Sequence, residues 1–326
     1  MKKKSKILLI SFILSLPFWW GMNILAKDVE DFWFQQKIVK NPEILTAAVS
    51  QKILERKIKE LELEKLQEER LENLEIEARA AISVEVDSKD KERILFEKNP
   101  QKPLAVASLT KLMTALIVFD LDETYSPSQI ITITKEAVEQ EGSSKYGDLE
   151  VGENLSVEAL LYTMLIESSN DAAFALSQLI GQEGFVDLMN LYAKNLGLEK
   201  TYFVNPNGLE PDNLQEPKNL STARDLVKLS KFILKNYPQI FEITANQSYE
   251  VLKPDGSLHH FIPENTNKLL GEIPEIIGGK TGWAVEASGC LLLILDNPDS
   301  NKYYINIVLG AKDRFAEMRK IIDTIK

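Results

Sequence analysis

The sequence contains very little cysteine and histidine. Its 326 residues include one cysteine, Cys290, and two histidines, His259 and His260. A single thiol cannot form an internal disulfide or a cysteine-based zinc site. Adjacent side chains in an extended segment point to opposite faces, so the two histidines are not expected to act together. A His-based triad and a multi-histidine metal site are therefore not expected, and the sequence predicts no metal and no cofactor.

Positive charge is also in deficit. The chain has 38 Lys and Arg against 49 Asp and Glu, which gives a net charge of −11. General nucleic-acid binding needs clustered positive charge, so no nucleic-acid partner is predicted. The hydrophobic share of 44% is ordinary for a globular protein.

One long uncharged run stands near the N-terminus. Residues 7–26 follow four lysines and approach the length of a membrane-spanning helix. The positive-inside rule then predicts that residues 1–27 form a cytoplasmic end and a transmembrane signal-anchor. A cleaved secretory signal is the alternative reading. Both readings export the rest of the chain, and the first predicts a single-pass protein of the cell membrane with an extracytoplasmic catalytic domain.

The next segment, residues 28–80, is expected to be a helical stalk. Between Pro42 and Ala81 the chain is rich in Glu, Lys, Leu and Arg and contains no glycine. Leu54, Ile58 and Leu61 follow coiled-coil spacing, although the register slips soon afterwards. Two interpretations remain open: a weak coiled coil that forms a dimer, or a single solvated helix.

Residues 81–326 carry the pattern of one folded domain. Periodicity predicts helices over 109–119, 157–181 with an interruption, 185–196, 220–234 and 314–325. It predicts strands over 82–87, 93–98, 249–252, 258–262, 289–295 and 303–309. This order favours an α+β fold, in which helices flank an antiparallel sheet and a helical subdomain is inserted.

The first chemical motif is Ser108-Leu109-Thr110-Lys111. Residues three apart at the start of a helix share a face, so a neutral Lys111 amine could take the Ser108 proton. Such a lysine needs burial or a nearby positive charge to lower its pKa. Ser-x-x-Lys is common by chance, but here apolar residues 104–107 precede it and an apolar helix follows it.

The second motif, Ser168-Ser169-Asn170, interrupts two apolar helical stretches. Ser and Asn are usual helix caps, which is one interpretation. In the other, the Ser168 hydroxyl relays a proton between Lys111 and a leaving amine, and the Asn170 amide donates to a substrate carbonyl.

The third motif is Lys280-Thr281-Gly282, preceded by Gly278 and Gly279. Glycines beside a polar pair in a strand allow another backbone to approach closely. A substrate could pair with this strand through backbone hydrogen bonds, while Lys280 and Thr281 bind a carboxylate. A plain loop before a strand is the alternative.

In this order the three motifs form the set typical of penicillin-binding proteins and β-lactamases. The region from about Ala81 onward resembles low-molecular-mass penicillin-binding proteins of the D-alanyl-D-alanine carboxypeptidase type. Further matching segments cover 107–115, 169–173, 203–209, 221–225 and 265–270.

The resemblance implies a role for each motif residue. Ser108 is expected to form an acyl-enzyme, with Lys111 as general base and Ser168 as proton relay to the departing D-alanine. The substrate-binding residues implied by the resemblance are Asn170, Lys280, Thr281, Gly282 and Trp283. Backbone N–H groups of Ser108 and Trp283 would form the oxyanion hole. The implied partners are peptidoglycan pentapeptide stems and, as covalent inhibitors, β-lactams; no metal or cofactor is implied.

Two positions depart from the family pattern, and other functions stay open. Ala284 stands where the family usually has threonine, and Lys312 stands where some relatives place a carboxylate-binding arginine, although it could equally be a solvated lysine. The alternatives on the same scaffold are a D,D-endopeptidase and a β-lactamase, but no clear deacylating glutamate is found around Glu210. A non-catalytic muropeptide-binding envelope protein is a further alternative.

Overall fold

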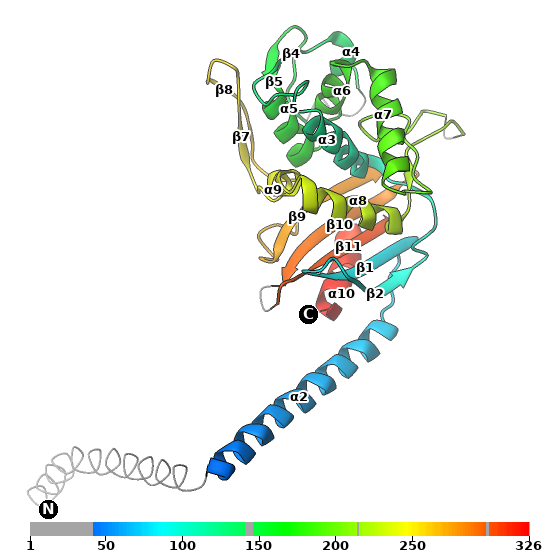
Figure 1. Ribbon diagram of the computed structural model, residues 1–326. Helices are drawn as coiled ribbons and strands as arrows, with labels where there is room; N and C mark the ends of the chain where they lie inside the picture. The colour runs from blue at the N-terminus through cyan, green and yellow to red at the C-terminus, as the bar shows by residue number, and fades with distance from the viewer. Residues whose placement is uncertain (1–41, 141–145, 214, 298–299, 326) are drawn as a thin grey trace, which may run out of the picture. The chain divides into compact units, whose positions relative to one another are not determined.

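The structure is a computed structural model that describes residues 42–140, 146–213, 215–297 and 300–325 (Figure 1). The chain divides into two compact units, residues 1–66 and 67–326. The segment expected to span the membrane, residues 7–26, lies outside the described residues. Within the described ranges, no helix is both long and apolar enough to cross a bilayer.

Helix α2 (Pro42–Glu72) begins in the first unit and ends in the second. It covers residues 42–72 of the segment expected to be a stalk, and its apolar side chains from Ile53 to Leu66 are 47–60% exposed. A coiled-coil contact between two chains stays a prediction. The globular unit begins earlier than the expected residue 81, because Leu71, Ile76 and Ala78 are buried against its sheet and last helix.

A five-stranded antiparallel sheet forms the centre of the globular unit. Its strand order is β2-β1-β11-β10-β9, so the first hairpin pairs with the last strands of the chain. The bounds are β1 Ala80–Asp87, β2 Glu92–Lys98, β9 Ile276–Ala284, β10 Ser288–Asn297 and β11 Lys302–Ala311. The expected antiparallel α+β architecture is confirmed.

Each face of the sheet carries its own hydrophobic core. Side chains alternate along a strand, so Leu292 and Ile294 join one core while Leu291 and Leu293 join the other. Helix α10 (Arg314–Ile325) and residues 71–78 cover the second face. For this reason β1 is buried on both faces along most of its length, although its alternating sequence suggested a half-buried strand.

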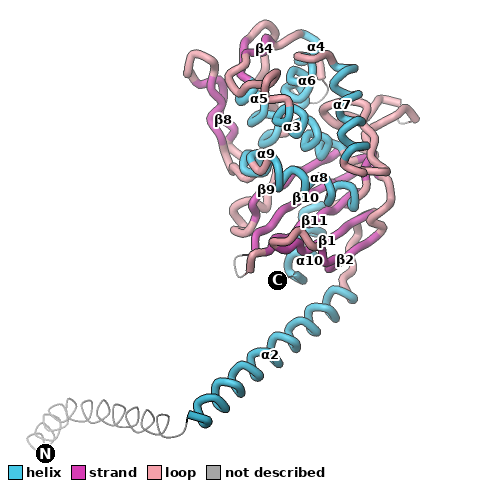
Figure 2. The backbone as a smooth tube through the Cα atoms, in the orientation of Figure 1, coloured by secondary structure: helices cyan, strands magenta, loops and turns pink. Residues whose placement is uncertain are grey.

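The other face supports the inserted helical cluster (Figures 1 and 2). Its helices are α3 Lys111–Asp120, α4 Lys135–Val138, α5 Val157–Tyr162, α6 Asn170–Gln178, α7 Gln182–Asn195, α8 Ala223–Asn236 and α9 Gln239–Thr244. Three small two-stranded sheets complete it: β3 Leu104–Ala105 with β6 Leu220–Ser221, β4 Ile130–Thr132 with β5 Asn154–Ser156, and β7 Tyr249–Leu252 with β8 Leu258–Ile262. The short elements α4, α9, β4 and β5 were not predicted, because each has too few residues to show a period.

The two histidine side chains do not lie on opposite faces as expected. The rings of His259 and His260 meet edge to face with centroids 4.8 Å apart. The pairing of β7 with β8 shifts register between Val251 and Leu252, so the hairpin departs from regular alternation.

Candidate active site

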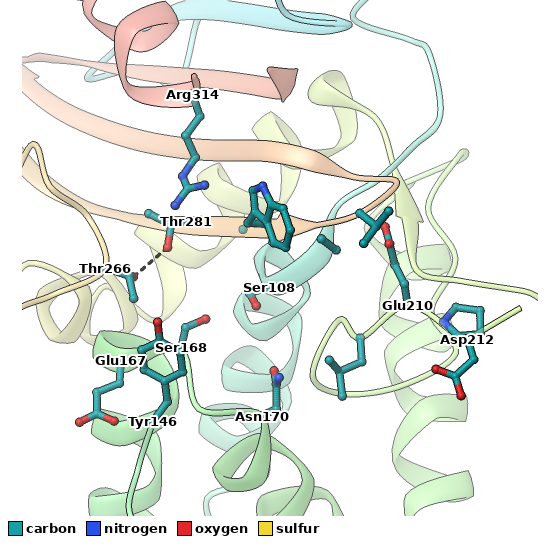
Figure 3. Close-up of a pocket in the computed structure, with 16 residues that line it drawn as sticks. Ser108, Tyr146, Glu167, Ser168, Asn170, Glu210, Asp212, Thr266, Thr281 and Arg314 are labelled. Atoms are coloured by element: carbon teal, nitrogen blue, oxygen red, sulfur yellow. Dashed lines mark hydrogen bonds between the residues drawn. The ribbon is translucent and has the colours of Figure 1, made fainter. Parts of the chain in front are cut away.

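Ser108 lies in a tight turn that lines a cavity of the globular unit. It belongs to a 3₁₀ turn, Ala107–Thr110, between β3 and α3. Ala107 has φ 47°, in the left-handed region that residues with a side chain rarely occupy. This turn places the Ser108 side chain at a cavity of about 590 Å³ together with the other motifs (Figure 3).

Lys111 is the first residue of α3 and is completely buried. Its Nζ lies 2.9 Å from Ser108 Oγ, 2.7 Å from Asn170 Oδ1 and 2.6 Å from the Asn207 carbonyl oxygen. The amide oxygen and the carbonyl oxygen can only accept hydrogen bonds. A neutral amine has two N–H donors and one lone pair, so its lone pair must face the Ser108 hydroxyl.

Burial and charge favour that neutral amine. Desolvation first, and the nearby positive charge of Lys280 second, hold the pKa of Lys111 well below its usual value of 10.5. Asp171 acts in the opposite direction. A lysine with a lowered pKa next to a serine hydroxyl is the arrangement needed for a general base.

The second motif contains both a helix cap and two residues that line the cavity. The π-helical segment Thr163–Glu167 ends at Ser168, whose φ of 72° is left-handed. Ser169 caps α6, since its Oγ accepts from the Ala172 N–H at 3.1 Å. Ser168 and Asn170, on either side of this cap, line the cavity.

The third motif lies on β9, at the edge of the sheet. Lys280 Nζ lies 2.8 Å from Ser168 Oγ. Desolvation, assisted by the charge of Arg314, lowers the pKa of Lys280 to about 7. The Thr281 hydroxyl donates to Thr266 Oγ1 at 2.7 Å, and both side chains line the cavity.

Two glycines set the distances between these segments. A Cβ on Gly282 would lie 2.9 Å from the Val106 carbonyl oxygen and 3.2 Å from the Ser108 nitrogen. A Cβ on Gly208, where φ is +88°, would lie 2.1 Å from the Ala107 carbonyl oxygen. The turn that holds Ser108 is therefore packed between two backbones that could not approach so closely with side chains.

The remaining glycines of the third motif have a different role from the one expected. A Cβ on Gly278 would lie 2.5 Å from Phe241 Cβ in α9, and a Cβ on Gly279 would lie 2.4 Å from the Leu292 carbonyl oxygen. These positions admit parts of the protein itself and not a substrate backbone. Trp283 and Ala284 line the cavity at the end of β9, and the Trp283 side chain is 65% exposed.

The cation near the third motif is Arg314, not Lys312. Arg314 lines the cavity, and Figure 3 shows its side chain running from the start of α10 toward Thr281. Lys312 is exposed and lines neighbouring surface pockets but not this cavity. The sequence places the start of the last helix at Arg314 correctly, but it does not show which of the two cations turns inward.

Two contacts were missed because they depend on distant segments. The buried Asn207 presents its carbonyl oxygen to Lys111, 96 residues away. Glu210 lines the cavity, and its two carboxylate oxygens accept from the backbone N–H groups of Glu286 and Ala287 at 2.9 and 2.7 Å. The segment 203–209 matched the family pattern, but its spacing indicated no particular contact.

The sequence of this chain is similar to a known protein family and to several of its members. A family model described as D-alanyl-D-alanine carboxypeptidase matches residues 66–313. D-alanyl-D-alanine carboxypeptidase DacF of Bacillus subtilis is 35% identical over 254 residues, which cover 76% of this chain and 61% of DacF. A D-alanyl-D-alanine endopeptidase of Pseudomonas aeruginosa is 30% identical over 239 residues, which cover 70% of this chain and 72% of that protein.

A solved structure shows the same fold. Ampicillin-bound penicillin-binding protein D2 from Listeria monocytogenes superposes with a TM-score of 0.67 at 31% identity, covering 77% of this chain and 98% of that one. The matched region includes all three motifs, since they lie between residues 108 and 282. The chain belongs to the D-alanyl-D-alanine carboxypeptidase family of penicillin-binding proteins.

Proposed function

We propose that this protein is a serine D-alanyl-D-alanine carboxypeptidase that removes the terminal D-alanine from peptidoglycan stem peptides. The observation that carries this proposal is the buried Lys111, whose lowered pKa favours a neutral amine and whose three contacts would then direct the lone pair toward Ser108. Family membership supports the substrate class. The chain spans 61% of the length of DacF, so the activity is proposed and not transferred from that relative.

The reaction uses the three motifs in turn. Lys111 takes the Ser108 proton while Ser108 Oγ attacks the carbonyl carbon between the two D-alanines. The backbone N–H groups of Ser108 and Trp283 stabilise the oxyanion. Ser168, held by Lys280, passes its proton to the departing D-alanine nitrogen and takes up the proton that Lys111 received from Ser108. Water then hydrolyses the acyl-enzyme.

The substrate carboxylate is assigned to the Thr281 end of the cavity. Thr281 and Arg314 line that end together, and Lys280 adds positive charge when protonated. Asn170 binds the acyl part of the substrate from the opposite side. Ala284 removes one hydroxyl from this region relative to the usual family pattern, and the Arg314 guanidinium supplies donors there.

Release of D-alanine from diacetyl-L-Lys-D-Ala-D-Ala tests the proposal. We expect release by the full chain and none by Ser108→Ala. A fluorescent penicillin should label the full chain at Ser108, because β-lactams acylate the same nucleophile. Failure to label, or labelling that survives Ser108→Ala, would overturn the mechanism and favour a non-catalytic binding protein.

The endopeptidase is the second candidate, since one similar relative carries that name. Cleavage of cross-linked muropeptides without D-alanine release from the short peptide would favour it. The β-lactamase alternative has less support. Both carboxylate oxygens of Glu210 accept hydrogen bonds from the backbone N–H groups of residues 286 and 287, so this carboxylate is not placed to act as the base that activates a deacylating water. Rapid deacylation of bound penicillin would favour this alternative.

We further propose that residues 7–26 anchor the protein in the cell membrane with the catalytic unit outside the cytoplasm. Support comes from the preceding lysines and the uncharged run in the sequence. Retention of the unprocessed chain in the membrane fraction, with the catalytic unit open to external protease, tests this placement. A dimer through α2 is proposed with it, because six apolar side chains of that helix are exposed; cross-linking of Ile58→Cys chains tests the contact.

A further inference from the structure

The two histidines of the chain join two glutamates into one hydrogen-bonded series. His259 Nδ1 and His260 Nδ1 lie 2.6 Å apart. His259 Nε2 lies 2.9 Å from Glu153 Oε2, and His260 Nε2 lies 3.1 Å from Glu167 Oε1. We call Glu153, His259, His260 and Glu167 the histidine relay. Both imidazole side chains are largely buried, at 5% and 8% exposure.

The number of protons in the relay follows from its geometry. Each contact between a ring nitrogen and a carboxylate needs a proton on Nε2, and the contact between the two Nδ1 atoms needs one shared proton. The three contacts therefore need three ring protons in all. Two neutral imidazoles carry two protons, and two imidazolium ions carry four. The complete relay exists only when one histidine is neutral and the other is an imidazolium.

Both other protonation states break a contact. With two protons, one of the three contacts has no proton. At that contact, the lone pair of a ring nitrogen faces either a carboxylate oxygen or the lone pair of the other ring. With four protons, two N–H groups face each other across 2.6 Å. A gain or a loss of one proton by the pair therefore breaks one contact of the relay.

One end of the relay lies next to the catalytic machinery. Glu167 is 8% exposed and directly precedes Ser168, the left-handed residue that contacts Lys280. The other carboxylate oxygen of Glu167 is buried without a hydrogen-bond partner among the described residues, so this carboxylate depends on His260. The neighbouring Ile166 carbonyl accepts from the Thr266 N–H at 3.2 Å, which ties the same segment to the cavity wall.

The other end of the relay is open to solvent. The Glu153 side chain is 17% exposed, and His259 lines a surface pocket of about 480 Å³. The charged groups that share this pocket with His259 are Asp148, Glu150, Glu153, Asp171 and Lys253. The pocket therefore places four carboxylates and one ammonium group around the exposed side of His259.

We infer that His259 and His260 are positioning residues. They hold Ser168 through Glu167 only while one ring is an imidazolium and the other is neutral. Acylation of Ser108 therefore depends on relay protonation at both ends of its pH range. Neither histidine lines the Ser108 cavity, so the effect of the two rings reaches the reaction through Glu167 and the position of Ser168. The proposed function enters here only through the use of acylation as a readout.

The protonation state can be measured directly, because the chain has no other histidines. In the full chain, carrying a purification tag without histidine, long-range ¹H–¹⁵N spectra should show one imidazolium and one neutral ring, or their exchange average, near the pH of fastest acylation. Two neutral rings or two imidazolium rings at that pH would overturn the inference. The spectra do not depend on peptidase activity. If penicillin labelling fails, the absence of any pH range with one imidazolium and one neutral ring would still overturn the inference.

Three variants then test the link to Ser168, using the rate of labelling by a fluorescent penicillin between about pH 5.5 and 8.5. His259→Phe removes the contact between the two rings and leaves His260 Nε2 beside Glu167, so the relay-linked pH dependence of labelling should disappear. His260→Phe disconnects Glu167, and a misplaced Ser168 should slow labelling by about tenfold or more at every pH.

Glu153→Gln is the conservative variant and keeps a hydrogen-bond acceptor for His259. Because it removes a negative charge beside the imidazolium, the relay should lose its proton more easily, and the alkaline limb should move to lower pH. A purely structural role predicts lower stability with unchanged pH profiles. Variant profiles that superimpose on that of wild type after scaling would therefore overturn the proposed link.

Discussion

Lys280 Nζ lies 2.8 Å from Ser168 Oγ, so the cavity contains two serine–lysine pairs and not one. The other pair is Ser108 with Lys111, at 2.9 Å. The charge of Lys280 lowers the pKa of Lys111, so the pairs also interact electrostatically. One pair handles the proton of the nucleophile, and the other is placed to handle the proton of the leaving group.

Replacing Lys111 by arginine separates charge from basicity. Arginine keeps the positive charge but does not deprotonate in proteins, so it cannot take the Ser108 proton. We expect acylation by a fluorescent penicillin to fall by about 10³-fold, within the usual range for losing a general base. Lys111→Met should lose as much. Substantial acylation by the arginine variant would show that Lys111 acts by charge alone.

Replacing Lys280 by methionine should shift the pH dependence of acylation. Lys111 must be neutral to act, and the Lys280 charge is one cause of its lowered pKa. Without this charge the pKa of Lys111 rises, so the rate should increase with pH over a more alkaline range than in wild type. The pH profile of labelling measures the shift. A movement toward acid would contradict the assigned coupling.

Stability should also depend on pH through Lys280. Its pKa is about 7 in the folded chain and the usual lysine value is 10.5, so the unfolded chain binds more protons between these values. Stability rises with pH wherever the unfolded state binds more protons. The urea midpoint of wild type should therefore rise relative to that of Lys280→Met from about pH 7 to 10. Parallel curves would contradict the lowered pKa.

Arg314 and Lys312 form a matched pair for testing the carboxylate site. Arg314→Ala should raise KM for D-Ala-D-Ala peptides by about 10- to 100-fold, the effect of losing a hydrogen bond to a charged group. Lys312→Ala should change KM by less than about twofold, because an exposed side chain outside the cavity contributes little. Equal effects of the two changes would remove the proposed role of Arg314.

Gly282→Ala tests the close packing around the nucleophile. The added methyl group would meet the Val106 carbonyl oxygen at 2.9 Å and the Ser108 nitrogen at 3.2 Å. We expect labelling to slow by about 10²-fold through displacement of Ser108. Gly184→Ala, where no atom lies within 4 Å and φ is not positive, is a control for the loss of a glycine. Similar labelling rates for the two variants would argue against a positioning role of Gly282.

Periodic elements could be predicted from the sequence, and contacts between segments could not. Helix α10 begins at Arg314 as predicted, because its apolar spacing is regular. Which of Lys312 and Arg314 faces the cavity depends on the turn that joins β11 to α10, and not on the apolar spacing of the helix. The globular unit also begins before residue 81, since the apolar residues at the end of α2 look like stalk residues until their partners on α10 are known.

The catalytic motifs were predicted because the family pattern fixes residue type and order together. Their partners were harder to predict. Lys111 contacts the backbone carbonyl oxygen of Asn207, and because every residue type has such an oxygen, the sequence does not reveal this contact. The histidine contact was misjudged for a related reason. Strict alternation in β8 places neighbours on opposite faces, but the register shift beside Val251 lets the two rings meet.

The two glycines beside the nucleophile restrict how this site can evolve. Any side chain at Gly208 or Gly282 would collide with the backbone of the turn that holds Ser108. Resistance to an inhibitor that copies the substrate therefore cannot arise by substitution of either glycine. It has to come from the rim, where Trp283 and Val285 are 65% and 73% exposed and where side chains can change without moving the nucleophile.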